Sequence, residues 1–145
     1  MTGILLVRDF MSTNVKTVRT DVTVKEAVSK MNKFRISSII VVQGKRPVGI
    51  ITERDILERI VEPCMEPTAI TAKEIMSTPV IFTSPDVDIE DAARLMTAKK
   101  IKKLAVIENG KLVGIVSSMD LMSASPKLLN LLEELRRAKQ LKNEN

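Results

Sequence analysis

The stretch Val48-Gly49-Ile50-Ile51-Thr52-Glu53-Arg54-Asp55 has a counterpart 65 positions later, Val113-Gly114-Ile115-Val116-Ser117-Ser118-Met119-Asp120, which keeps the Val-Gly-Ile start and the final Asp. The same offset holds toward the N-terminus. It pairs Met11-Ser12-Thr13 with Met76-Ser77-Thr78, Asp21-Val22 with Asp86-Val87, Ala27 with Ala92, and Met31 with Met96. A single register kept over about 50 positions indicates an internal duplication, in which each copy is one structural unit.

A helix is predicted near the start of each copy. Thr23 and Glu26 have the spacing of a capping box, so the first helix should begin near Val24. Asp88 and Asp91 repeat this arrangement in the second copy. In both copies the apolar residues that follow recur at helical spacing, which predicts one face buried in a core.

Two apolar runs follow this helix in each copy and predict a β-hairpin. The predicted strands are residues 39–42 and 48–51, and residues 104–107 and 112–116. Asn109-Gly110 is among the strongest short hairpin signals. A short strand precedes the helix, at residues 15–18 or 80–83, and a second helix begins at Thr52 or Ser117. The order β-α-β-β-α, given twice, predicts an α/β fold in which each sheet must bury one face.

The remaining segments connect and follow the two copies. The repeat predicts one domain over residues 1–62, a linker over 63–71, a second domain over 72–125 and a tail over 126–145. Ser125-Pro126 has the pattern of a helix start, and the leucines after it predict an amphipathic helix from Lys127 to about Leu141. The leucine stripe comprises Leu128, Leu132 and Leu135, with Leu131 beside them. It should pack on its own chain or on a second copy, or dock a partner protein.

Composition excludes several classes of protein. The 145 residues are 44% hydrophobic and 28% charged, which is a globular balance. We expect a cytoplasmic protein, because the chain has no signal-peptide pattern and no apolar run of the roughly 18 residues that a membrane span needs. Histidine is absent and Cys64 is the single cysteine, so zinc chemistry and histidine catalysis are excluded.

The formal net charge of +5 suits an anionic partner. Trp and Tyr are absent and there are three Phe, so the aromatic platforms that bind single-stranded nucleic acid are missing. Nucleic acid therefore ranks below a small nucleotide as the expected partner, and it stays the alternative. The positive run Lys99-Lys100-Ile101-Lys102-Lys103 could steer phosphates, bind nucleic acid or keep the surface soluble.

The repeated motifs resemble those of the cystathionine β-synthase (CBS) domain family, whose tandem pair is often called a Bateman module. The resemblance extends from Val7 to Leu121 and is strongest in the two copies of the Gly-to-Asp string. It implies two CBS domains packed as a pseudo-twofold pair across a cleft with two sites for AMP, ADP, ATP or S-adenosylmethionine. It also implies a regulatory role, a homodimer and a partner protein that reads the ligand. Ile40 and Ala105 stand where the family often has proline at the start of the second strand. The family also often has proline shortly after the methionine of the first motif, where the second copy has Pro79 and the first has Asn14.

Side-chain chemistry at the repeated string suits a nucleotide. A helix that starts directly after a strand leaves N–H groups for a phosphate, and Thr52 or Ser117 can donate a hydroxyl to it. Asp55 or Asp120, one turn later, can accept from a pair of ribose hydroxyls. Thr-x-x-Asp is also an ordinary capping box, so a purely structural role is the alternative. Arg54 is either a phosphate ligand or a solvated charge.

The resemblance also assigns residues to the base. The first strand and the start of the second strand would line it, which gives Thr17 and Ser38 in the first copy and Phe82 and Lys103 in the second. Sheet packing is the alternative for Phe82, and a solvated charge for Lys103. The carboxylates have no accompanying histidine, plausible nucleophile or glycine-rich phosphate loop, so we predict that the chain is not an enzyme and needs no cofactor.

Overall fold

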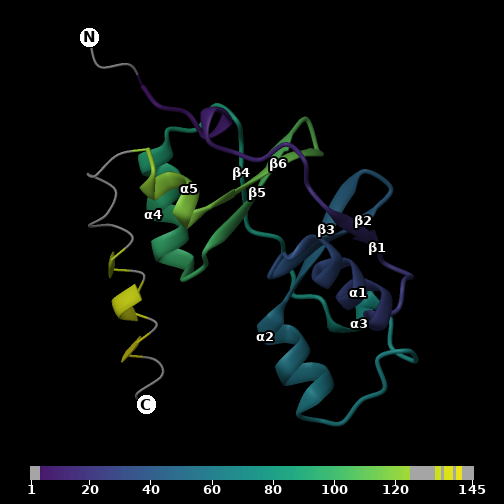
Figure 1. The fold of residues 1–145 in the computed structure, drawn as a ribbon. Helices are drawn as coiled ribbons and strands as arrows, with labels where there is room; N and C mark the ends of the chain where they lie inside the picture. Colours follow the sequence, from purple (N-terminus) through teal and green to yellow (C-terminus); the bar gives the residue numbers. More distant parts are fainter. Residues whose placement is uncertain (1–3, 125–132, 135, 139, 142–145) are drawn as a thin grey trace. The chain divides into compact units, whose positions relative to one another are not determined.

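The structure is a computed structural model that describes residues 4–124, 133–134, 136–138 and 140–141 (Figure 1). Its contacts form two compact units. One unit is Val15–Val80, and the other combines the residues before Val15 with those after Val80. Each unit contains one three-stranded sheet with helices, so the predicted α/β class is confirmed.

The unit Val15–Val80 contains a mixed sheet in the order β1-β2-β3. Its elements are β1 (Thr17–Arg19), α1 (Val24–Phe34), β2 (Ser38–Gln43), β3 (Arg46–Thr52), α2 (Glu53–Ile56), the π-helical turn η2 (Leu57–Val61) and α3 (Ala72–Ile75). Strand β1 is parallel to β2, and β2 is antiparallel to β3. The first strand is shorter than the sequence predicted, and β3 begins two residues earlier, at Arg46.

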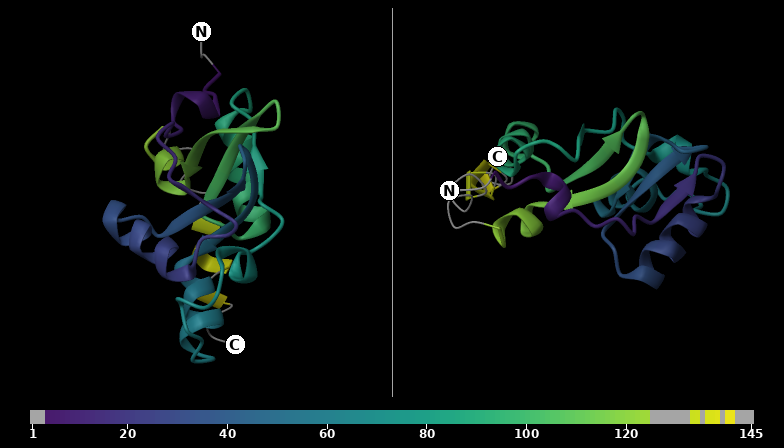
Figure 2. Two further views of the ribbon diagram at one scale, coloured as in Figure 1. Left: turned by 90° about the vertical axis from the view of Figure 1, so that its right-hand side faces the viewer. Right: turned by 90° about the horizontal axis from the view of Figure 1, so that it is seen from above.

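The other unit repeats this order with β4-β5-β6. Its elements are η1 (Val7–Asp9), β4 (Phe82–Thr83), α4 (Ile89–Lys99), β5 (Lys103–Glu108), β6 (Lys111–Ser117) and α5 (Ser118–Met122). The antiparallel strands β5 and β6 lie side by side along their length (Figure 2). Asn109 and Gly110 join them with φ angles of 54° and 76°, so the predicted hairpin turn is confirmed.

The two long helices begin differently. At α1 the capping box is formed, since Glu26 N–H donates to Thr23 Oγ1 over 3.1 Å and Thr23 N–H donates to Glu26 Oε2 over 3.3 Å. At α4, Asp88 Oδ1 instead accepts from Glu90 N–H over 2.8 Å. The aspartate at the third position, Asp91, is one methylene shorter than glutamate and pairs with Arg94. The expectation that both copies carry the same box is therefore wrong for the second copy.

Each sheet packs one face against the helices of its unit. In the first unit the buried cluster combines strand residues Val18, Ile39, Val41 and Ile51 with helix residues Val24, Ala27 and Met31. In the other it combines Leu104, Val106 and Val116 with Ile89, Ala92, Ala93 and Met96. Full burial of each large aliphatic side chain contributes about 1.5–3 kcal/mol to the stability of the folded state. These faces therefore provide most of the driving force for folding.

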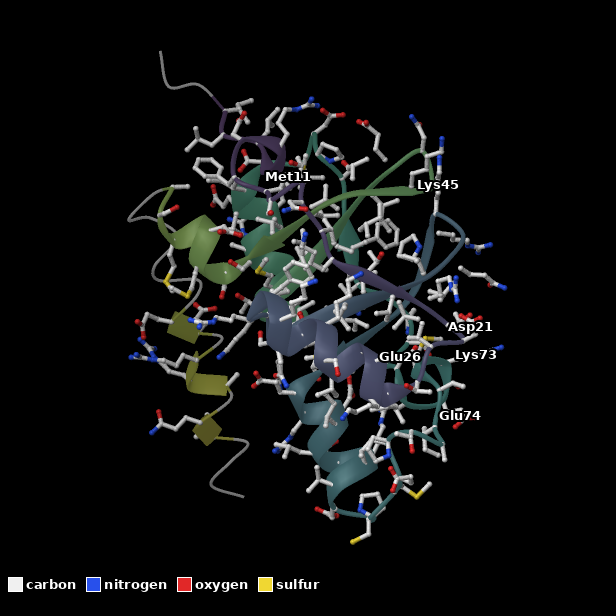
Figure 3. The ribbon with its side chains drawn as sticks, turned by 45° about the vertical axis from the view of Figure 1, so that its right-hand side comes forward. Met11, Asp21, Glu26, Lys45, Lys73 and Glu74 are labelled. Carbon is white, nitrogen blue, oxygen red and sulfur yellow. The ribbon has the colours of Figure 1, made fainter. Side chains whose placement is uncertain are left out.

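Two short helices that the sequence did not predict complete these cores. Helix η1 contributes Val7 to the cluster of the second copy, and α3 contributes Ala72 and Ile75 to that of the first. Helix α3 is fixed by backbone bonds from Ala72 N–H to Val22 O and from Lys73 N–H to Thr20 O. In Figure 3, Lys73 accordingly lies near Asp21, which follows Thr20 in the chain.

The segment that leads into each repeat packs on the hairpin of the other repeat. Ser12, before β1, exchanges backbone hydrogen bonds with Ile115 of β6, and Ser77, before β4, does the same with Ile50 of β3. The compact units therefore do not coincide with the sequence repeats, because the two leading segments are exchanged.

The expected leucine stripe of the tail lies outside the described residues. The stretches 133–134, 136–138 and 140–141 are helical. Within the described part of the chain, no helix has the length and apolar character needed to cross a membrane.

Candidate functional site

Three of the expected site residues share one face of the first sheet. Ser38 is paired directly with Thr52 across β2 and β3, and Thr17 is paired with Ile40, two residues along β2 from Ser38. Paired residues project to the same face, and side chains alternate along a strand. Thr17, Ser38 and Thr52 therefore lie on the face opposite the buried cluster of Ile39, Val41 and Ile51.

The second sheet repeats this arrangement with different side chains. Lys103 is paired with Ser117 across β5 and β6, and Phe82 is paired with Ala105. The same alternation places Phe82, Lys103 and Ser117 on one face, away from the cluster that contains Leu104 and Val106. Phe82 is 56% exposed, so it does not serve as a core residue of this sheet.

The hydroxyl group of Ser38 is buried and has no hydrogen-bond partner among the described residues. The residue is 6% exposed, and its Oγ atom makes no hydrogen bond with the described residues. Leaving a buried hydroxyl unsatisfied costs about 1–3 kcal/mol. Native proteins give almost every buried polar group a hydrogen-bond partner, so the Ser38 hydroxyl group is exceptional.

Where each strand runs into a helix, the backbone N–H groups already donate to acceptors of the same chain. In the first copy Thr52 N–H donates to Asp55 Oδ2 over 2.9 Å, Glu53 N–H to Ser37 O over 3.1 Å, and Asp55 N–H to Thr52 Oγ1 over 3.2 Å. In the second copy Ser117, Ser118 and Asp120 repeat the three bonds. The expected row of unpaired N–H groups is therefore largely occupied within the chain, because the capping box and the residue just before β2 or β5 supply acceptors.

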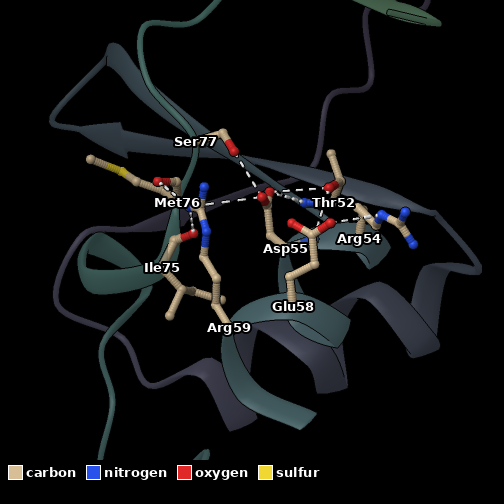
Figure 4. A network of polar contacts seen from close by, with 8 residues as sticks. All are labelled: Thr52, Arg54, Asp55, Glu58, Arg59, Ile75, Met76 and Ser77. Atoms are coloured by element: carbon tan, nitrogen blue, oxygen red, sulfur yellow. Dashed lines mark hydrogen bonds and ion pairs between the residues drawn. The ribbon is translucent and has the colours of Figure 1, made fainter. Parts of the chain in front are cut away.

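Asp55 is the centre of a larger polar network (Figure 4). Its side chain is 7% exposed, and Oδ2 also accepts from Thr52 Oγ1 over 3.1 Å. Its other oxygen, Oδ1, accepts from Ser77 Oγ over 2.7 Å and lies 3.8 Å from Arg59 Nη1. The same Arg59 nitrogen donates to the carbonyl oxygens of Ile75 and Met76. Both carboxylate oxygens are thus engaged.

The Asp120 carboxylate accepts fewer hydrogen bonds than the Asp55 carboxylate. It is half-buried, and Oδ2 accepts from Ser117 N–H over 2.8 Å. Among the described residues, no hydrogen bond or ion pair engages Oδ1. The residue that matches Arg59 at the repeat offset is Ala124, which has no charge to offer. The two expected ribose acceptors therefore differ in availability.

Arg54 points to solvent beside its own helix. Its side chain is 71% exposed and forms an ion pair with Glu58 over 2.9 Å. An exposed pair of this kind stabilises little, so the guanidinium group is available to an anion at small cost.

The sequence reasoning missed Arg59 and Ser77. Ser77 carried a signal, because Met76-Ser77-Thr78 matches Met11-Ser12-Thr13 at the repeat offset. Arg59 carried none, since its counterpart is alanine. The described residues contain no cluster of three or more histidine, cysteine or acidic side chains arranged for a metal ion.

Comparisons with known proteins agree on one family. The CBS domain model matches residues 7–62 and 72–127. An uncharacterized protein of Methanopyrus kandleri is 39% identical over 114 residues, which are 77% of this chain and 58% of that protein. The CBS domain-containing protein YhcV of Bacillus subtilis is 35% identical over 115 residues, which are 79% of this chain and 81% of that protein.

A solved structure gives the same result for the fold. The crystal structure of the conserved CBS domain protein TA0289 of unknown function from Thermoplasma acidophilum matches with a TM-score of 0.80 at 27% identity. The match covers 92% of this chain and 78% of that one. The chain thus spans less than two thirds of the Methanopyrus relative and most of the other two proteins.

Proposed function

This chain belongs to the CBS domain family, whose tandem pairs are regulatory ligand-binding modules, and from that premise we propose that its ligand is an adenosine nucleotide. The nucleotide binds at the sheet faces that carry Ser38 with Thr52 and Lys103 with Ser117. Thr17 and Phe82 contact the base, Arg54 meets a phosphate, and Asp55 or Asp120 accepts from the ribose.

The observation that carries this proposal is the orphaned hydroxyl of Ser38, which is 6% exposed. A ligand that reaches this face would supply the missing hydrogen bond. Adenine fits this requirement because its ring nitrogens accept and its amino group donates, while its flat apolar rings tolerate a largely buried face. The positive run up to Lys103 favours an anionic ligand, since a basic surface concentrates phosphates.

The regulatory part of the proposal follows from linkage. A ligand that binds one arrangement of the chain more tightly shifts the population toward it, and a partner protein can read the shift. We propose no catalytic role, and the homodimer and protein partner expected from the sequence stay predictions.

A panel of ligands tests the proposal on the full chain. AMP, ADP, ATP, S-adenosylmethionine, NAD and a DNA duplex would each be added in a thermal-shift assay. We expect at least one adenosine compound to raise Tm by roughly 5–15 °C at a hundredfold excess over its Kd, because binding to the native state stabilises it by about 2.7 kcal/mol. A shift with DNA alone that falls steeply with salt would favour the nucleic-acid alternative.

The variant Ser38→Ala tests the carrying observation. We expect the nucleotide affinity of the first-copy site, measured by titration calorimetry, to fall about 2- to 10-fold, the net value of one neutral hydrogen bond. We also expect the variant's stability to stay level or to rise by up to about 1 kcal/mol, because an unsatisfied group is removed. Ser29→Ala, an exposed serine of α1, is the matched control: it should leave the affinity unchanged and raise stability only by the helix propensity of alanine, about 0.5 kcal/mol. A gain in stability with unchanged affinity would contradict the role of Ser38.

A further inference from the structure

Asp55 Oδ1, Ser77 and Arg59 form a contact that we call the latch. It joins α2 and η2 to Ile75 at the end of α3 and to the two residues after it, Met76 and Ser77. The Ser77 hydroxyl donates to Asp55 over 2.7 Å, and the carboxylate it reaches is 7% exposed. A hydrogen bond to a buried charged acceptor is among the stronger kinds, so the latch holds Asp55 firmly.

The latched segment is anchored along its backbone as well. Ser77 N–H donates to Ile50 O over 2.8 Å, and Ile50 N–H donates to Ser77 O over 3.1 Å. After Val80 the chain leaves this unit and continues into β4. The latch therefore ties the candidate site of the first copy to the segment that connects the two units.

The described residues of the second copy do not form a matching latch. Ser12 matches Ser77 both at the repeat offset and in its packing, since it pairs with Ile115 as Ser77 pairs with Ile50. Over the described residues, however, no hydrogen bond joins the Ser12 side chain to Asp120. Ala124 stands where the first copy has Arg59.

We infer that Ser77 and Arg59 make the two nucleotide sites unequal by occupying Asp55. This inference rests on the proposed function and adds to it which copy binds first. Asp120 can accept from ribose hydroxyls without breaking a contact. Asp55 can do so only when Ser77 and Arg59 give up Oδ1, and that loss is subtracted from the affinity. Because such coupling is reciprocal, a nucleotide on Asp55 loosens residues 75–77.

Titration calorimetry with AMP and with ATP tests the inference on the full chain. Wild type should show one tight step and a second step weaker by roughly tenfold or more, the value of a charge-assisted hydrogen bond. Asp120→Asn should remove the tight step. Adding Ser77→Ala to Asp120→Asn should tighten the remaining step by roughly tenfold. Adding Ser12→Ala to Asp120→Asn is the matched control and should leave that step unchanged.

Hydrogen exchange at the Ser77 amide gives a second readout that needs no variant. Saturating nucleotide should speed its exchange, because opening the latch frees residues 75–77. Two equal steps in wild type, a remaining step that Ser77→Ala leaves unchanged or weakens, or slower Ser77 exchange would each overturn the inference while the proposed function stands. Absence of binding by every adenosine compound would overturn the proposed function, and this inference with it.

Discussion

Residues 1–62, expressed without the rest of the chain, should aggregate or self-associate instead of folding as a monomer. The fragment contains β1 to β3 with α1 and α2, but it lacks α3, whose Ala72 and Ile75 are 0% and 4% exposed in the same core. Leaving out one large buried aliphatic side chain costs about 2–5 kcal/mol, against a total stability of about 5–15 kcal/mol. A unit of about 60 residues has little to spare.

The matched control is the fragment Val15–Val80. It has a similar length, keeps α3 and omits the leading segment that packs in the other unit. Size-exclusion chromatography with light scattering and circular dichroism would compare the two fragments. We expect Val15–Val80 to be more soluble and more helical than residues 1–62. A cooperative monomer from residues 1–62, or a Val15–Val80 fragment that behaves no better, would contradict the role given to α3.

Local signals explain why the sequence predicted most elements correctly. The Thr23 and Glu26 pattern locates the start of α1, and Asn109-Gly110 locates the hairpin of the second copy, because each depends only on neighbours in the chain. The second capping box failed for a local reason too. Asp91 is one methylene shorter than glutamate and pairs with Arg94 instead of the N-cap backbone.

Non-local packing explains what the sequence did not predict. Helices η1 and α3 are short, and Val7 and Ile75 are buried in clusters with residues distant in the sequence, so no helical periodicity predicts these helices. Ser38 and Thr52 lie on one face because they are paired across β2 and β3. Strand alternation predicts that shared face only when the pairing of the two strands is given. The contact between Asp55 and Ser77 links residues that are 22 positions apart, and no pairing rule from the sequence reaches it.

Gly49 and Gly114 show how closely the exchanged segments approach the two hairpins. A Cβ atom on Gly49 would lie 2.3 Å from Met76 Sδ, and one on Gly114 would lie 2.7 Å from Met11 Sδ. Real Cβ atoms essentially never approach other atoms below 3.0 Å. The described glycines with positive φ are Gly44 and Gly110, so at positions 49 and 114 the requirement is space and not backbone freedom.

Gly49→Ala and Gly114→Ala should each destabilise the full chain by about 1–3 kcal/mol, the usual cost of overpacking. For a chain of this size that corresponds to a fall in Tm on the order of 5–10 °C. The cause differs between the two sites. At Gly49 all the nearest atoms belong to the Met76 side chain, whereas at Gly114 the backbone oxygen of Ser12 lies 2.9 Å from the added carbon.

A double-mutant cycle separates these causes. Met76→Ala should rescue Gly49→Ala, so that the double variant is more stable than the sum of the two single effects by about 1 kcal/mol or more. Met11→Ala should rescue Gly114→Ala much less, because Ser12 O remains in the way. This oxygen accepts from Ile115 N–H over 2.9 Å and moves only if that bond is lost. Urea denaturation of the six variants measures the difference, and equal rescue at both sites would show that the backbone at residues 11–12 yields as easily as a methionine side chain.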